Sequence, residues 1–195
     1  MEAYMADGYH HGNLRQALID AGIKLINRDG EENLSLRRAA AACGVSHAAP
    51  YAHFKDKEEL IDAIKESVTE KFMKELEDAA EGCESADDAL IYMGSAYITF
   101  FSKHPDYFVF LFGKQKITAH TQMNKENKND YPPFLLIRQM YKKHLEEKNI
   151  ELSEEEQEIG LIKVWSMIHG MASIACMKGV RTSFNWKDPD LRLLL

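Results

Sequence analysis

Residues 36–54 read LRRAAAACGVSHAAPYAHF, and this stretch decides the fold of the N-terminal part of the chain. Its alanine-rich half predicts a short helix that ends near Cys43. Gly44 can then adopt the left-handed backbone that turns the chain sharply. Ser46 can cap a second short helix that ends near Phe54. Two short helices joined by a glycine turn predict a helix-turn-helix, which presents its second helix to the major groove of DNA.

Further helices are predicted on both sides of this stretch. Before it, apolar residues recur every three or four positions over about residues 10–28, and Ser35 can cap the helix that follows. After it, Asp56 precedes Lys57-Glu58-Glu59, an N-cap followed by carboxylates in the first turn. A long helix is therefore predicted from there to about residue 80.

The rest of the chain also has helical periodicity, with 5 prolines, 11 glycines and no alternating strand pattern. We predict a polar loop over residues 113–130. The further helices are predicted over about residues 85–103, 105–112, 132–148, 153–178 and 188–195. The fold is thus predicted to be all-α with about nine helices, divided into a three-helix helix-turn-helix domain at residues 9–56 and a helical bundle at residues 57–195.

The composition of the 195 residues is that of an ordinary globular protein, with 45% hydrophobic and 28% charged residues. The formal net charge is −7, of which −1 falls in residues 1–56 and −6 in residues 57–195. The three cysteines are scattered and lack metal spacing, which predicts reduced thiols in a cytoplasm. No apolar run approaches the roughly 18 residues of a membrane span and no signal sequence opens the chain, so we expect no membrane association.

Four polar side chains gather where the helix-turn-helix ends and the next helix begins: Tyr51, His53, Lys55 and Lys57. Their hydroxyl, imidazole and ammonium groups can bond DNA phosphates, contacts that position a protein on the duplex without specifying its sequence. The N-terminal amides of the helix that begins at Lys57 can add to such a contact. Phe54, in contrast, is predicted to be a core aromatic.

Residues 44–60, GVSHAAPYAHFKDKEEL, resemble the helix-turn-helix signature of the tetracycline-repressor (TetR) family of transcription regulators. Residues 9–15, YHHGNLR, are similar to the entry into the family's first helix, and the resemblance is specific over residues 9–60. Farther on, Trp165 and the His-Gly pair at residues 169–170 are similar to a signature in the C-terminal domain of one branch of the family.

The resemblance implies a homodimer whose paired helix-turn-helix units bind a pseudo-palindromic operator. It also implies a C-terminal domain that binds a small effector and releases the DNA. Arg37 occupies a position that can read a base or a phosphate, and residues 46–48 lie at the front of the recognition helix. The candidate DNA-binding residues are Arg37, Ser46, His47, Ala48, Tyr51, His53, Lys55 and Lys57.

Pro50 departs from the family pattern. It stands four residues after the supposed cap at Ser46, where a backbone N–H would normally bond, and proline has none. Two starts of the recognition helix are therefore open. The helix begins at Ser46, or it begins later and the base-reading residues move toward Ala49 and beyond.

Aromatic residues and methionines are concentrated in the C-terminal part of the chain. An apolar pocket with a few polar groups is the usual form of a small-molecule site, but such a stripe at helical spacing also fits a helix core. We expect some of these residues to form a pocket for a mainly apolar or aromatic effector. The candidates are Tyr92, Tyr97, Phe101, Tyr107, Phe108, Phe112, Met140, Trp165 and His169.

The helix predicted at residues 153–178 is apolar around more than half of its circumference, with Gly160 and Gly170 interspersed. This is more apolar surface than one core contact requires, and small residues allow a second helix to approach closely. We expect a two-fold dimer through this helix and the short segment 188–195.

Two other classes of function remain open. An enzyme is disfavoured because the sequence lacks a Gly-rich phosphate loop, a nucleophile elbow and a His/carboxylate pair at metal spacing, so we predict no catalytic residues, metal or cofactor. A helical protein-interaction module, or a ligand-binding protein without DNA affinity, would keep the helices without needing the polar cluster around Tyr51. The favoured interpretation is a dimeric, ligand-responsive DNA-binding regulator: a repressor released from a palindromic operator by a small apolar or aromatic effector.

Overall fold

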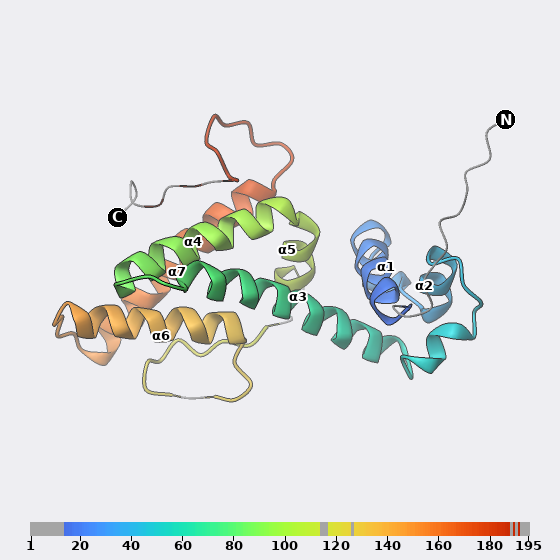
Figure 1. Cartoon of the computed structure of the whole chain (residues 1–195), viewed down its shortest axis with the longest axis horizontal. Helices are drawn as coiled ribbons and strands as arrows, with labels where there is room; N and C mark the ends of the chain where they lie inside the picture. Colours follow the sequence, from blue (N-terminus) through green and yellow to red (C-terminus); the bar gives the residue numbers. More distant parts are fainter. Residues whose placement is uncertain (1–13, 114–116, 126, 188, 190, 192–195) are drawn as a thin grey trace. The chain divides into compact units, whose positions relative to one another are not determined.

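Every regular element that the structure describes is a helix in the computed structural model shown in Figure 1. The structure describes residues 14–113, 117–125, 127–187, 189 and 191. Within these ranges the chain forms seven α-helices, two 3-10 helices and no strand, which confirms the all-α prediction. The chain divides into two units, one ending at Ser67 and the other beginning at Val68, and the division falls inside helix α3 (Lys57–Ala80).

The first unit consists of two α-helices, two short 3-10 helices and the first part of α3. The elements before α3 are α1 (Leu14–Asp29), η1 (Glu31–Asn33), α2 (Leu36–Ala42) and η2 (Ala49–Ala52). Helix α1 packs against η1, α2 and η2, and α2 also packs against η2. Helix α1 corresponds to the helix predicted over residues 10–28, whose first four residues lie outside the described ranges.

The core of the first unit includes the contact between α1 and α3. Leu18 and Ile19 of α1 and Leu60 and Ile64 of α3 are at most 2% exposed. Gly22 permits the close approach, because a Cβ atom at this position would lie 2.7 Å from Cδ1 of Ile64. Burial of one such aliphatic side chain contributes about 1.5–3 kcal/mol relative to leaving it in water. The start of α3 is thus an integral part of the first unit.

The helix ends of this unit are set by the residues that the sequence indicates. Ser35 Oγ accepts a hydrogen bond from the Arg38 backbone N–H at 3.2 Å, and Asp56 Oδ1 accepts one from the Glu59 N–H at 2.9 Å. Gly44 has a φ of +68°, a left-handed conformation that L-residues rarely adopt. These observations confirm the predicted start of α2, the sharp turn after it and the start of α3.

Asp29, the last residue of α1, joins two arginines. Its carboxylate accepts hydrogen bonds from Nε and Nη2 of Arg28 at 2.8 and 2.7 Å, and it pairs with Arg38 of α2. Arg38 Nη1 also donates to the Asn33 carbonyl at 2.7 Å. The hydrogen bond from Arg28, with a smaller contribution from Arg38, lowers the pKa of Asp29 to about 2. This cluster ties the end of α1 to α2.

The substitution Asp29→Asn is expected to destabilise the protein in a pH-dependent way. Because the folded-state pKa lies below the ordinary value of 3.8, the charged carboxylate stabilises fully above about pH 4, and its contribution is lost as the pH falls toward about 2. Urea unfolding of both proteins across this range measures the difference in their free energies of unfolding. That difference should be constant down to about pH 4 and then shrink, whereas a constant difference throughout would exclude a role for the charge.

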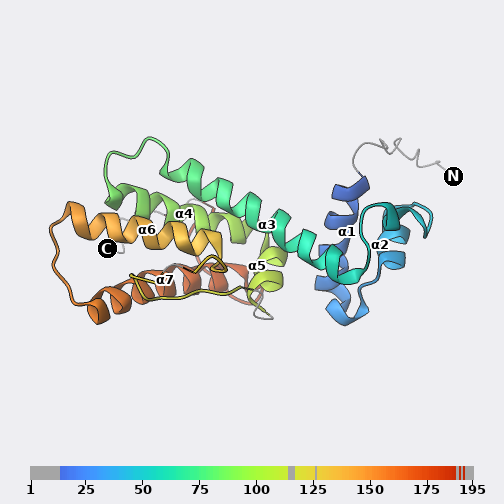
Figure 2. The ribbon, with the colours of Figure 1, turned by 90° about the horizontal axis from the view of Figure 1, so that it is seen from below.

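The second unit is arranged around α4. Its elements after α3 are α4 (Ala86–Lys103), α5 (Pro105–Phe112), α6 (Pro132–Glu147) and α7 (Glu154–Cys176). Helix α4 packs against α5, α6 and α7, and α5 packs against α7. Figure 2 shows α4, α6 and α7 running alongside one another. The loop between α5 and α6 contains no helix in its described residues, in agreement with the predicted loop.

Aromatic rings fill the core of the second unit. The ring centroid of Phe72, on α3, lies 4.9 Å from that of Tyr97, 5.1 Å from that of Phe100 and 4.7 Å from that of Phe101. Phe72 and Phe101 are fully buried. Ring pairs at such distances contribute about 0.5–1.5 kcal/mol each beyond the area that they bury. The cluster fastens the second half of α3 to α4.

Capping residues again set the helix starts. Ser85 caps α4 by accepting a hydrogen bond from the Asp88 N–H at 3.1 Å, and Pro105 opens α5. Ser153 and Glu156 form a capping box at the start of α7, as predicted. Helix α7 ends at Cys176, close to the predicted end near residue 178.

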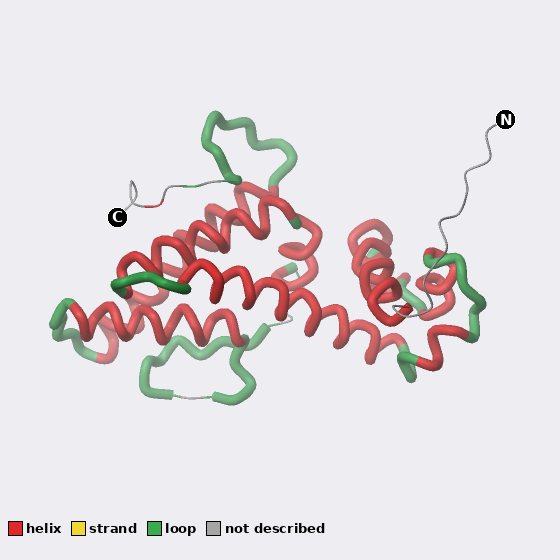
Figure 3. The backbone as a smooth tube through the Cα atoms, in the orientation of Figure 1, coloured by secondary structure: helices red, strands yellow, loops and turns green. Residues whose placement is uncertain are grey.

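The chain is irregular from the end of α7 to residue 187. Residues 177–187 form a loop, drawn in green in Figure 3. The helix predicted over residues 188–195 falls largely outside the described residues, which include only positions 189 and 191 of it. Leu191 is 2% exposed and packs on Gly94, where a Cβ atom would lie 2.6 Å from Cδ1 of Leu191. This segment therefore covers part of α4.

Helix α7 exposes an unusual amount of apolar surface. By length and composition it is apolar enough to cross a membrane, and only 17% of its most apolar 18-residue window is buried. The prediction concerned an uninterrupted apolar run, and α7 contains none of that length, because Lys163 and His169 lie within it. Its apolar character is instead spread over a window that includes several small residues, so the expectation of no membrane association stays a prediction.

Candidate DNA interface and ligand hollow

The segment predicted as the recognition helix forms a turn followed by one short 3-10 helix. The Ala49 backbone N–H donates to the Ser46 carbonyl at 3.0 Å, and η2 begins only at Ala49. Pro50 lies in the first turn of η2, where its missing N–H costs no helical hydrogen bond. The helix start at Ser46 is therefore wrong, and the later start that Pro50 indicates is confirmed.

The residues proposed for DNA contact lie on the surface of the first unit, over a buried layer. Phe54 is 1% exposed, which confirms it as a core aromatic, and Pro50 is buried with it. Arg15 lies over the Phe54 ring, with its guanidinium carbon 5.5 Å from the ring centroid. Lys57 is half-buried, and the other candidates are exposed: Arg37, Ser46, His47, Ala48, Tyr51, His53 and Lys55.

The two lysines of this surface differ in their surroundings. Lys57 Nζ donates to the Glu32 carbonyl at 3.3 Å, which holds the ammonium group beside η1. Lys55 Nζ lies 3.6 Å from Asp56 Oδ2 and is largely exposed. In an exposed pair such as this the attraction is weak, so a DNA phosphate can compete for the Lys55 ammonium group.

A hollow of about 360 Å³ opens in the second unit between α5, α7 and the loop that follows α5. It is lined by Phe112, Ile117, Trp165, Ser166 and His169. The volume is in the range of small-molecule sites, and the lining is mainly apolar with two polar side chains. We call it the aromatic hollow.

A buried hydrogen bond fixes the imidazole of the aromatic hollow. The Tyr97 hydroxyl lies 2.8 Å from Nδ1 of His169. Burial raises the pKa of Tyr97 well above its ordinary value, so the phenol keeps its proton. Burial also lowers the pKa of His169, so the ring is neutral at pH 7 and carries its proton on one of the two ring nitrogens. The largely apolar hollow thus contains one neutral imidazole, held in place by the Tyr97 hydroxyl.

The residues proposed for the effector pocket divide between this hollow and the core. Phe112, Trp165 and His169 line the hollow, and Phe108 contacts the His169 ring at 5.0 Å between centroids. Tyr97 and Phe101 are buried beneath it.

Three further candidates lie elsewhere. Tyr92 is 47% exposed and lines a separate depression beside Gly82 and Glu84, and Tyr107 stacks on His104 at 4.9 Å. Met140 does not line the aromatic hollow. Two lining residues were missed, because Ile117 lies in a loop without periodicity and Ser166 is a polar residue of an apolar helix.

The described residues contain no group of three or more His, Cys, Asp or Glu side chains placed to hold a metal ion. The Cys176 thiol donates to the Phe101 carbonyl at 3.3 Å, and burial raises its pKa to about 11. It therefore remains a protonated thiol at pH 7 and is neither a nucleophile nor a ligand in this state.

Comparison with known proteins places the first unit in a family. Residues 18–64 match the model described as bacterial regulatory proteins, tetR family. A stretch of 70 residues is 37% identical to the HTH-type nicotine-responsive transcriptional repressor HdnoR of Paenarthrobacter nicotinovorans and covers 36% of each chain. A stretch of 54 residues is 43% identical to the class C tetracycline repressor protein of Escherichia coli, covering 28% of this chain and 25% of that protein. The chain thus matches these relatives over about a third or less of their length.

The similarity of fold extends over nearly the whole chain. The crystal structure of a regulatory protein of the tetR family from Rhodococcus RHA1 superimposes with a TM-score of 0.64 at 16% identity, covering 90% of both chains. At that identity the match concerns the fold alone, so the family assignment depends on the first unit. Residues 18–64 thus match the helix-turn-helix unit of the tetR family of bacterial regulatory proteins, and the whole chain shares the fold of a solved member of that family.

Proposed function

We propose that this protein is a dimeric transcriptional repressor that binds a palindromic operator through its first unit and is released by a small apolar or aromatic effector bound in its second. The proposal is carried by the exposed turn and 3-10 helix at residues 46–52, supported from beneath by Phe54. The two relatives of the first unit are named as repressors, which supports this direction of regulation. The match of residues 18–64 to the tetR family supports a cytoplasmic regulator rather than an enzyme.

The short recognition element limits which side chains reach the bases. His47 and Ala48 stand in the exposed turn before η2, where an imidazole can bond a purine edge and a methyl group can contact a thymine methyl. Arg37, on α2, can reach either a base or a phosphate. The remaining candidates would hold phosphates and so fix the position of the unit on the duplex: Ser46, Tyr51, His53, Lys55 and Lys57.

We propose that α7 forms the dimer interface with a second copy of the chain. Ile159, Ile162 and Ile174 are exposed along one side of this helix. A Cβ atom at Gly170, on the same side, would meet no other atom within 4 Å, so a partner helix could approach there. Gly160 has a different role, because a Cβ atom there would overlap the Tyr141 hydroxyl of α6. A two-fold dimer provides the symmetry that two half-sites of a palindrome require.

The aromatic hollow connects to α3 through buried contacts. A ligand that touches His169 can shift the Tyr97 side chain, which is hydrogen-bonded to it and packs edge-on against Phe72 of α3. The same helix begins in the first unit, where Leu60 and Ile64 are core residues. We propose that effector binding favours one placement of α3 and thereby changes the spacing of the two recognition elements in the dimer. Half-sites one helical turn apart tolerate little change in that spacing.

Selection of bound duplexes from a random-sequence pool, at near-physiological salt, tests the proposed function. Enrichment of an inverted repeat is the expected result and would establish DNA binding and two-fold symmetry together. The selection is repeated with protein that has been unfolded and refolded to remove any bound effector. If folded, ligand-free protein enriches no sequence, the operator-binding proposal is wrong and a helical module without DNA affinity replaces it.

The substitution Lys57→Ala is expected to weaken binding to all duplexes alike and to lower the slope of log affinity against log salt by about one, because one phosphate contact is lost. The slope is measured by fluorescence anisotropy over a range of salt concentrations. Lys74→Ala is the matched control, since Lys74 pairs with Asp78 on the later part of the same helix. A slope unchanged by Lys57→Ala would remove Lys57 from the DNA interface.

A further inference from the structure

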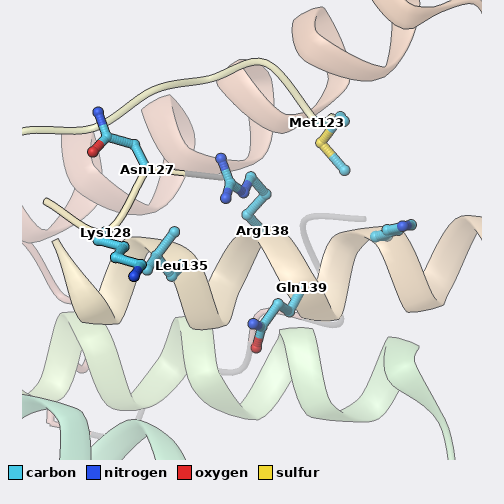
Figure 4. A pocket seen from close by; sticks show the side chains of 7 residues that line it. Met123, Asn127, Lys128, Leu135, Arg138 and Gln139 are labelled. Atoms are coloured by element: carbon cyan, nitrogen blue, oxygen red, sulfur yellow. The ribbon is translucent and has the colours of Figure 1, made fainter. Parts of the chain in front are cut away.

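A second hollow, of about 340 Å³, lies between α6 and the loop at residues 117–131, and its walls are polar and basic. Figure 4 shows Arg138 rising from α6 toward the loop, with Asn127 and Met123 on either side of it. The other described residues that line it are Lys128, Leu135, Gln139 and Lys142. We call it the basic hollow.

Arg138 is the fixed element of the basic hollow. The residue is only 6% exposed, and its Nη1 donates to the carbonyls of His120, Gln122 and Lys125 at 3.1, 3.3 and 2.9 Å. Nε and Nη2 have no hydrogen-bond acceptor among the described residues. The guanidinium is thus held rigidly by one nitrogen while its other N–H groups remain free to bond a ligand.

The charge of Arg138 is balanced, but the described residues that line the hollow are positive in sum. Asp130, buried behind it, has Oδ2 3.7 Å from Arg138 Nη1, and its other oxygen lies 2.6 Å from Nδ1 of His120. Lys128 and Lys142 add two positive charges that have no ion-pair partner in the described part of the chain. No carboxylate is among the described residues that line the hollow. This concentration of positive charge contrasts with the net charge of −7 of the whole chain.

From this arrangement we infer that the basic hollow binds a small organic anion, with a carboxylate or phosphate group bonded by Arg138, Lys128 and Lys142. The side chains of Met123 and Leu135 supply apolar wall for a short carbon chain attached to that group. A rigid guanidinium flanked by flexible ammonium groups is suited to such an anionic group, because the fork fixes its orientation and the lysines add charge. The amides of Asn127 and Gln139 can bond further polar atoms of the ligand.

This site is separate from the aromatic hollow but shares a segment with it. Ile117 lines the aromatic hollow, while Met123 and Asn127, farther along the same loop, line the basic hollow. The loop is also tied to α7, because Thr121 donates to Glu158 and Asn124 donates to Glu154 at 2.7 Å. An anion bound in the basic hollow would therefore contact a loop that also forms one wall of the aromatic hollow.

The test uses the full-length protein without DNA, so that its outcome is independent of the proposed repressor function. Hexanoate, hexyl phosphate and the uncharged hexan-1-ol are titrated against protein with 13C-labelled methionine methyl groups, and the Met123 signal is identified by its loss in Met123→Leu. We expect at least one of the two anions to shift this signal, with a Kd on the order of 1 mM. Hexan-1-ol should bind at least about tenfold more weakly, and the anion that binds more tightly identifies the preferred group.

The double variant Lys128→Gln, Lys142→Gln should weaken anion binding by about tenfold or more. Both lysines are exposed, so the fold is preserved, which the unchanged methyl spectrum of the unliganded variant verifies. Lys143→Gln is the matched control, because Lys143 neighbours Lys142 but pairs with Glu147 instead. The inference is overturned if neither anion shifts the Met123 signal or if the alcohol binds as tightly. It is also overturned if the double variant binds like the wild type or if Lys143→Gln has an equal effect.

Discussion

The double substitution Ile159→Asp, Ile162→Asp on α7 is expected to convert the protein to a monomer and to weaken operator binding by about 10²–10⁴-fold. Both isoleucines are exposed in the single chain, so the substitutions leave its core intact. In a dimer formed through α7 they would bury unpaired carboxylates, which costs several kcal/mol per charge. Binding is weakened because a monomer can occupy only one half-site. In a dimer, binding of the first half-site holds the second recognition element at a high effective concentration near the second half-site.

Light scattering gives the mass of each variant, and titration of the selected duplex gives its affinity at one fixed salt concentration. Val109→Asp is the matched control, since Val109 of α5 is 57% exposed and lies outside the proposed interface. A double variant that remains dimeric and binds normally would exclude α7 as the interface. A wild-type protein that is monomeric in buffer but binds lipid vesicles through α7 would assign the apolar face to a membrane instead.

The substitution Phe72→Ala is expected to lower the free energy of unfolding by about 3–5 kcal/mol, which is a large share of the stability of an ordinary domain. The side chain is fully buried and is in contact with three aromatic rings of α4. Its removal forfeits the transfer free energy of the ring and leaves a cavity that the surrounding helices can fill only in part.

Urea unfolding followed by circular dichroism measures this loss. Tyr92→Ala is the control, because Tyr92 is also an aromatic residue in the second unit but is 47% exposed, so its removal should cost only about 0.5 kcal/mol. If the Phe72 variant loses no more stability than the Tyr92 variant, the aromatic cluster is not the core of the second unit. A folded Phe72 variant that binds operator but no longer responds to effector would support the route from His169 through Tyr97 to α3.

The parts of the fold that could be predicted from the sequence are those governed by local rules. Ser35, Asp56, Ser85 and Ser153 each cap the helix assigned to them, because a side-chain oxygen three residues before an orphan N–H is a local contact. The start of the recognition helix was harder to predict. Its sequence contains a cap and a proline that indicate different starts, and the structure follows the proline.

The binding surfaces of the second unit were less predictable because they depend on contacts between distant segments. Tyr97 and His169 both lie in helices rich in apolar residues, but Tyr97 is buried in the core and His169 lines the aromatic hollow. Their exposure depends on how α4 packs against α7, which the sequence does not show. The loop at residues 113–130 has no periodicity to interpret. In this loop, Ile117 lines the aromatic hollow and Met123 lines the basic hollow. Both placements depend on the hydrogen bonds by which Arg138 holds the loop against α6.

Because α3 runs without a break from the first unit into the second, an insertion or deletion within it affects both units. Its buried residues recur every four positions, from Leu60 and Ile64 in the first unit to Val68, Phe72 and Leu76 in the second. One residue inserted or deleted near Ser67 would turn all later side chains of the helix by about 100° about its axis. Each half of the helix would keep its apolar stripe toward its own core, but the two units would be rotated against each other by that angle. Because the proposed regulation depends on how α3 places the recognition element, such single-residue changes are expected to abolish it while both cores remain folded.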